Sequence, residues 1–229
     1  ISGMSLLILA GLFIGYSHLS ALDQGVMTLV QEHRKPMMDE VAVVFTLIGE
    51  FRNMLLFSAL LTGLLLLMRQ WRHAIFAGST LLFTALANTA TKYFFARVRP
   101  EVLSDPLTSY SMPSGHASGS FALFLTLAVL AGRGQPPRMR LTWLLVGCLP
   151  ALAISLSRVY LGAHWPTDVL AGAMLAACVC AASLWLIQRD TSLSALPPKV
   201  WWLVLPSLVA LFGFFVLRHL PHTMLRYAY

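Results

Sequence analysis

Three segments of the chain carry ionisable side chains at spacings that suit chemistry on an anion. The first runs from Lys92 to Arg99-Pro100, with Asn88 one helical turn before Lys92 on the same face. Pro100 disfavours a helical conformation at Arg99, which is therefore expected in the loop just beyond a helix. These two cations suit a bound anion, or else they snorkel to lipid headgroups. Arg97, between them, is predicted to snorkel.

The second segment is Pro113-Ser114-Gly115-His116, directly before a long apolar run. A helix that begins here presents unpaired backbone N–H groups and the positive end of its dipole, which together bind anions. Ser114 can cap this helix or donate its hydroxyl to a phosphate, and Gly115 permits close approach to the backbone. His116 has a reference pKa of about 6.5 and can act as a general acid, although a lone histidine at a span end is more often an interfacial residue.

The third segment contains Ser157-Arg158, His164 and Asp168, and Pro166 suits the first turn of a following helix. His164 then lies just before that helix and Asp168 lies in its first turn. A carboxylate at this spacing can accept a proton from one imidazole nitrogen and leave the other as a nucleophile. Alternatively, Asp168 only complements the helix dipole.

Together the segments supply three cations, two histidines, one carboxylate and one helix N-terminus. This set suits phosphoryl transfer without a metal: cations neutralise the phosphate oxygens, one histidine attacks phosphorus and the other protonates the leaving oxygen. No cluster has the ligand pattern of a metal site.

The composition indicates the elements that must position these groups. The chain has 229 residues, 58% hydrophobic and only 11% charged, whereas soluble domains are about 25% charged. A soluble globular domain, a disordered chain and a nucleic-acid binder are therefore excluded. Cys148, Cys178 and Cys180 fall in apolar runs and are expected to be packing residues.

The predicted fold is all-α, a polytopic transmembrane bundle with a six-helix core and a seventh, C-terminal span. A span needs about 20 apolar residues, and the predicted spans are 4–22, 54–68, 74–95, 114–131, 141–156, 166–187 and 200–217. Residues 23–40 are expected at the membrane interface, with a break at Arg34-Lys35-Pro36. Residues 41–49 either extend the second span or lie in the interface. We interpret 1–229 as a single domain, with the core at about 4–187 and the extra span at about 200–217.

Positive charge is distributed unevenly between the two faces of this bundle. The chain has 16 Lys and Arg against nine Asp and Glu, a net charge of +7. Three short loops on one face contain a single acid, Asp190, and the basic residues Arg69, Arg72, Arg133, Arg138, Arg140, Arg189 and Lys199. Such loops are typically cytoplasmic, so the three chemical segments are expected on the periplasmic or outer face.

Taken together, the three segments resemble the signature of the type-2 phosphatidic acid phosphatase superfamily, the lipid phosphate phosphatases, which are related to glucose-6-phosphatase and the vanadium haloperoxidases. Its first motif, Lys, six residues and Arg-Pro, is matched by Lys92 and Arg99-Pro100. Its second motif is Pro-Ser-Gly-His, which this chain has at 113–116. Its third motif is Ser-Arg followed by five residues, His, three residues and Asp, and the chain matches it at 157–168. No motif position departs from the pattern.

The resemblance implies roles for these residues. His164 becomes a phosphohistidine, Asp168 orients it, and His116 protonates the leaving group and then activates water. The groups implied to hold the phosphate are Lys92, Arg99, Ser114, the Gly115 amide and Arg158. No metal or organic cofactor is implied.

The expected protein is an integral membrane lipid phosphatase of the bacterial inner membrane, acting on a phosphomonoester or pyrophosphate of a lipid. Its expected partners are a lipid phosphate substrate and membrane lipids, and no nucleic acid. Undecaprenyl pyrophosphate and phosphatidylglycerophosphate are the favoured substrates. The alternatives are a lipid phosphotransferase that uses the same phosphohistidine, and a non-catalytic membrane protein that binds an anion or a lipid.

Overall fold

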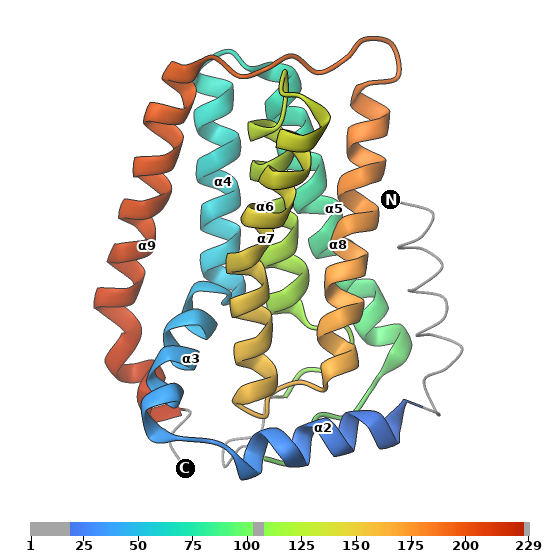
Figure 1. Cartoon of the computed structure of the whole chain (residues 1–229), viewed down its shortest axis with the longest axis vertical. Helices are drawn as coiled ribbons and strands as arrows, with labels where there is room; N and C mark the ends of the chain where they lie inside the picture. The colour runs from blue at the N-terminus through green and yellow to red at the C-terminus, as the bar shows by residue number, and fades with distance from the viewer. Residues whose placement is uncertain (1–18, 103–107, 227–229) are drawn as a thin grey trace.

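The computed structural model describes residues 19–102 and 108–226, and this part of the chain is helical with no strand. The predicted all-α fold is therefore confirmed. Figure 1 shows long helices packed side by side, with one helix lying across an end of the bundle. The helices are α2 (Ser20–Glu32), α3 (Pro36–Ile48), α4 (Phe51–Leu67), α5 (Trp71–Phe95), α6 (Gly115–Ala131), α7 (Pro137–Tyr160), α8 (Pro166–Ile187) and α9 (Pro198–Arg226).

Four of the described helices, α5, α7, α8 and the 198–220 part of α9, are long and apolar enough to cross a membrane. The pair α3 and α4 passes the same test as one span bent by 50°, and α6 is a shorter apolar helix. These elements match the predicted spans two to seven in order. The first predicted span, 4–22, lies outside the described residues except for its last few, which begin α2.

The segment before α4 forms two helices separated at the predicted break. α2 ends at Glu32 and α3 begins at Pro36, where a missing N–H costs no helical hydrogen bond. α2 crosses the end of the bundle (Figure 1), and α3 continues into α4 through the 50° bend. The buried side chain of Asn53 donates to the carbonyl of Leu47 across this bend at 2.6 Å. Residues 41–49 thus belong to α3, which forms either the first part of a broken second span or part of a re-entrant segment.

Helix α6 is the centre of the bundle and contacts α4, α5, α7 and α8. Close approach of α8 to its N-terminus depends on Gly172, because a Cβ at that position would lie 2.7 Å from the backbone oxygen of Ser114. Asn88 of α5 donates to the Ser118 hydroxyl of α6 at 2.9 Å. The start of α6 is therefore held between α5 and α8, at the same end of the bundle as α2.

Substitution of Gly172 by Ala is expected to lower the thermal unfolding midpoint of the detergent-solubilised protein, since overpacking against a backbone atom costs about 1–3 kcal/mol. Gly63 on α4 is the matched control because a Cβ there meets no atom within 4 Å. Gly63→Ala should leave the midpoint unchanged or raise it, as Ala favours a helix over Gly by roughly 1 kcal/mol. Equal midpoints for the two variants would contradict this account of the α6–α8 contact.

Candidate active site

The three predicted segments meet at one end of the bundle, around a cavity of about 880 Å³. They come from the end of α5, the start of α6 and the connection between α7 and α8, which lie at the end crossed by α2 (Figure 1). The cavity is lined by six of the eight predicted site residues: Lys92, Arg99, Gly115, His116, Arg158 and His164. The other two, Ser114 and Asp168, are fully buried behind its wall.

His164 and Asp168 face each other at the start of α8. Gly162, with φ of 70°, turns the chain after α7, and Pro166 begins α8. His164 Nδ1 lies 3.5 Å from Asp168 Oδ2, and both side chains are almost wholly buried. This distance exceeds that of a normal hydrogen bond, as is common in ligand-free catalytic sites. The structure thus brings together the pair that the spacing predicted.

The other imidazole nitrogen of His164 faces the cations. Its Nε2 lies 3.0 Å from Arg99 Nη1 and accepts from it, which places the ring proton on Nδ1, toward Asp168. Burial, followed by the positive charges of Arg99 and Arg158, holds the pKa of His164 well below its ordinary value. A neutral imidazole with its Nε2 lone pair toward the cavity is the form that can attack an electrophile.

Asp168 is held by donors from several segments besides its contact with His164. Its Oδ2 accepts from the Ser111 hydroxyl and, at 2.9 Å, from the backbone N–H of Trp165. Its Oδ1 accepts from Arg97 Nη1 at 2.7 Å. The carboxylate therefore caps the start of α8, where it also complements the helix dipole. The same carboxylate faces His164.

The prediction that Arg97 snorkels to lipid headgroups is wrong. Arg97 is 7% exposed and forms ion pairs with Asp168 and Asp23. α5 ends at Phe95, and its C-cap residue Ala96 has a left-handed φ of 45°. Arg97 therefore does not continue the helix toward the lipid headgroups. The chain turns inward instead, and Arg97 lies beneath the start of α8.

The Pro-Ser-Gly-His segment forms the N-terminus of α6 as predicted. Ser114 is the N-cap, and its Oγ accepts from the backbone N–H of Ala117 at 3.4 Å. Its own N–H donates to the backbone carbonyl of Asp168 at 2.9 Å, which joins the second segment to the third. A Cβ at Gly115 would meet only Asn88 Oδ1, at 3.6 Å, so the backbone is open toward the cavity.

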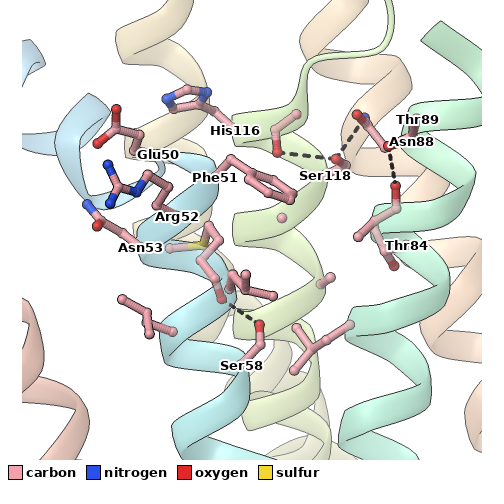
Figure 2. Close-up of a pocket in the computed structure, with 18 of the residues that line it drawn as sticks. Glu50, Phe51, Arg52, Asn53, Ser58, Thr84, Asn88, Thr89, His116 and Ser118 are labelled. Atoms are coloured by element: carbon pink, nitrogen blue, oxygen red, sulfur yellow. Dashed lines mark hydrogen bonds between the residues drawn. The ribbon is translucent and has the colours of Figure 1, made fainter. Parts of the chain in front are cut away.

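His116 projects from the first turn of α6 toward the corner between α3 and α4. Figure 2 shows it beside the Glu50 end of α4, across the cavity from Asn88 of α5. A Cβ at Gly49 would lie 3.0 Å from the His116 ring, so this corner approaches the histidine closely. His116 therefore stands where the wall formed by α3 and α4 meets the polar end of the cavity.

The remaining two cations are anchored by oxygen atoms. Arg158, in the last turn of α7, is 1% exposed, and its Nη1 donates to Thr46 Oγ1 of α3 at 2.9 Å. Thr46 Oγ1 lies 3.0 Å from Ser157 Oγ. Lys92 Nζ donates to the carbonyl of Tyr110 at 2.5 Å. Polar contacts thus orient both cations beside the cavity.

Sequence reasoning missed the residues that support the motifs, namely Asp23, Thr46, Arg97 and Ser111. For Asp23 a signal existed, because it shares the buried face of α2 with Met27, one helical turn later. An acid on the buried face of an amphipathic helix needs a partner. Thr46 and Ser111 carry no such signal, because hydroxyls are common in membrane helices and loops.

The fold and the cavity define a helical membrane protein with a basic, histidine-bearing site. The family model described as "PAP2 superfamily" matches residues 72–192, more than half of the chain. The chain belongs to the PAP2 superfamily, and the resemblance seen in the three motifs is confirmed.

Several curated proteins and solved structures are similar to this chain. An undecaprenyl-diphosphatase of Sulfolobus acidocaldarius is 36% identical over 129 residues, covering 50% of this chain and 55% of that protein. The phosphatidylglycerophosphatase B of Bacillus subtilis is 33% identical over 93 residues, covering 38% and 44%. The chain thus spans about half the length of these curated relatives.

One of the similar solved structures is that of a transmembrane PAP2-type phosphatidylglycerolphosphate phosphatase from Bacillus subtilis. It has a TM-score of 0.68 and 22% identity, and the match covers 82% of this chain and 94% of that one. At this identity the match establishes the shared fold.

Substitution of Thr46 by Val should raise KM for a lipid phosphate about tenfold or more, because Arg158 loses an acceptor that orients it. A lost hydrogen bond to a charged group is worth about 1.5–3 kcal/mol. Thr62→Val is the control, since Thr62 lines the same cavity but packs against Gly78 rather than a cation. Steady-state kinetics of both variants in the same detergent would test this. Similar KM values would show that Thr46 does not position Arg158.

Proposed function

We propose that this protein is an integral membrane lipid phosphatase that hydrolyses a phosphate ester or diphosphate through a phosphohistidine at His164. One observation carries the proposal: the two ring nitrogens of a buried, neutral His164 face opposite charges. Nδ1 lies 3.5 Å from Asp168 Oδ2, and Nε2 lies 3.0 Å from Arg99 Nη1 beside the cavity. A protein that only binds anions has no need of an oriented, unprotonated imidazole among its cations.

In the first step, the phosphate of the lipid enters among the cations Lys92, Arg99 and Arg158 and near the backbone N–H of Gly115. A phosphate oxygen replaces Nε2 as a partner of Arg99, which frees the His164 lone pair. Nε2 then attacks phosphorus as the bond to the leaving oxygen breaks, and His116 gives that oxygen its proton. The cations stabilise the charge on the phosphoryl oxygens during transfer.

In the second step, His116 accepts a proton from water as the water oxygen attacks the phosphohistidine. The bond between Nε2 and phosphorus breaks, inorganic phosphate leaves, and His164 returns to its neutral form. Asp168 stabilises the positive charge that the imidazole carries while phosphorus is attached to it. Ser114 contributes by capping α6, which aims the N–H groups of that helix at the phosphate.

We favour undecaprenyl pyrophosphate or phosphatidylglycerophosphate as the substrate. Relatives named for these activities support this choice. The cavity also suits such lipids, because it continues from the cations to apolar residues such as Leu55, Leu81 and Ala122. A headgroup can therefore reach His164 while its chain stays beside α4 and α5. We further propose that residues 1–229 act as one membrane domain in the bacterial inner membrane, with the site toward the periplasmic or outer face.

The test is phosphate release from a panel of lipid phosphates by the purified protein. His164→Ala should reduce turnover by at least roughly 10³-fold and still bind substrate, and Asp168→Asn by roughly 10²–10⁴-fold. His33→Ala is the control, since His33 is exposed at the end of α2. Near wild-type turnover by His164→Ala would exclude it as the nucleophile. A phosphorylated acceptor lipid in place of free phosphate would identify a phosphotransferase.

Turnover should be unchanged by EDTA, because side-chain cations supply the charge that a metal would otherwise provide. Orthovanadate should inhibit competitively, since it adopts the trigonal-bipyramidal geometry of the transition state and can bond to Nε2 of His164. Both measurements use the same phosphate-release assay. A reversible loss of activity on chelation, restored by a divalent cation, would contradict this mechanism.

A further inference from the structure

We propose that Asp23 of α2, acting through Arg97, is a positioning residue that sets the orientation and the charge of Asp168. The inference deepens the proposed function and rests on His164 being the nucleophile. Asp23 lies outside the three motifs, and Arg97 occupies one of the six unspecified positions of the first. Asp23 of α2 contacts Thr167, and Arg97 contacts Asp168, both in the first turn of α8. α2 is the helix that crosses the end of the bundle (Figure 1).

The guanidinium of Arg97 bridges two buried carboxylates. Its Nη2 lies 2.6 Å from Asp23 Oδ2, and its Nη1 lies 2.7 Å from Asp168 Oδ1. Asp23 is 1% exposed and Asp168 is fully buried, so solvent screens neither ion pair appreciably. The planar fork of an arginine can hold two oxygens at fixed positions, which an ammonium cannot do.

Thr167 ties the same cluster to the backbone of α8. Its N–H donates to Asp23 Oδ1 at 3.0 Å and its hydroxyl to Asp23 Oδ2 at 2.5 Å. Arg97 Nη1 also donates to the Thr167 hydroxyl at 2.7 Å. Asp23 thus holds the residue next to Asp168, and any shift of α2 is passed on to the first turn of α8.

The two oxygens of Asp168 have separate partners. Oδ1 faces Arg97, whereas Oδ2 faces His164 Nδ1, the Ser111 hydroxyl and the Trp165 N–H. Because Arg97 holds Oδ1 in place, Oδ2 stays directed at the imidazole. Arg97, which α2 holds through Asp23, therefore fixes the position of the carboxylate together with Ser111 and Trp165.

The charge of the cluster also depends on Asp23. One guanidinium between two carboxylates leaves one negative charge near His164, which the imidazole needs when bonding to phosphorus makes its ring positive. Without the charge of Asp23, the charge of Arg97 would offset that of Asp168 instead of being shared between two carboxylates. Opposite charges interact strongly at these distances in a buried site. Asp23 should therefore act on the chemical step and hardly at all on substrate binding.

Asp23→Asn tests this, because it removes the charge and keeps the shape. We expect kcat to fall about 10–100-fold, as typically follows loss of an outer partner, with KM within about twofold. Orthovanadate inhibition should weaken by a similar factor, since vanadate bonds to His164, while inhibition by inorganic phosphate should change little. Asp39→Asn is the matched control: it breaks the 2.7 Å ion pair with Arg34 at the start of α3, away from the cavity.

The outcomes separate this inference from the proposed function. If the wild type and Asp39→Asn release phosphate and Asp23→Asn matches them, Asp23 does not position Asp168. The inference is also wrong if Asp23→Asn weakens vanadate and phosphate inhibition alike and lowers the thermal midpoint, because that pattern indicates a purely structural role. If the wild type releases no phosphate from any lipid and does not bind vanadate, the proposed function itself is wrong. This inference is then wrong as well.

Discussion

The site depends on burying the carboxylate of Asp168 at the start of α8. An ionised carboxylate away from water is costly unless it is paired and fully hydrogen-bonded. Three segments supply those partners here. Arg97 follows α5, the Ser111 hydroxyl lies in the loop before α6, and the Trp165 N–H belongs to the N-cap residue of α8. Satisfying one carboxylate thus draws together the chain segments that carry the three motifs.

The central helix α6 completes this arrangement. Its N-cap residue, Ser114, donates its backbone N–H to the carbonyl of Asp168, and Gly172 allows α8 to approach that same turn. The end of α6 that faces the cavity is therefore fixed against the helix that holds the carboxylate. The proposed binding of a phosphate by the backbone N–H groups of this turn needs such rigidity, because these donors cannot reorient to follow a misplaced ligand.

The cations around the cavity are held apart by neutral oxygens. Arg158 donates to Thr46, Lys92 donates to the carbonyl of Tyr110, and Arg99 donates to Ser109 and Ala163 as well as contacting His164. Carbonyl and hydroxyl oxygens thus orient these side chains beside the cavity. Arg97, by contrast, forms ion pairs with Asp23 and Asp168 and does not line the cavity.

The sequence alone determined the helical membrane class, the order of the spans from residue 54 onward and the three motifs, because apolar periodicity and motif spacing are local properties of the chain. It also indicated that the net charge of +7 lies largely in short loops rather than in a nucleic-acid surface. Only the tertiary structure decided that Arg97 is buried and forms ion pairs with both Asp23 and Asp168. Those contacts join residues 74 and 71 positions apart in the chain, and they depend on the left-handed turn at Ala96 and the path of α2, which no local pattern specifies.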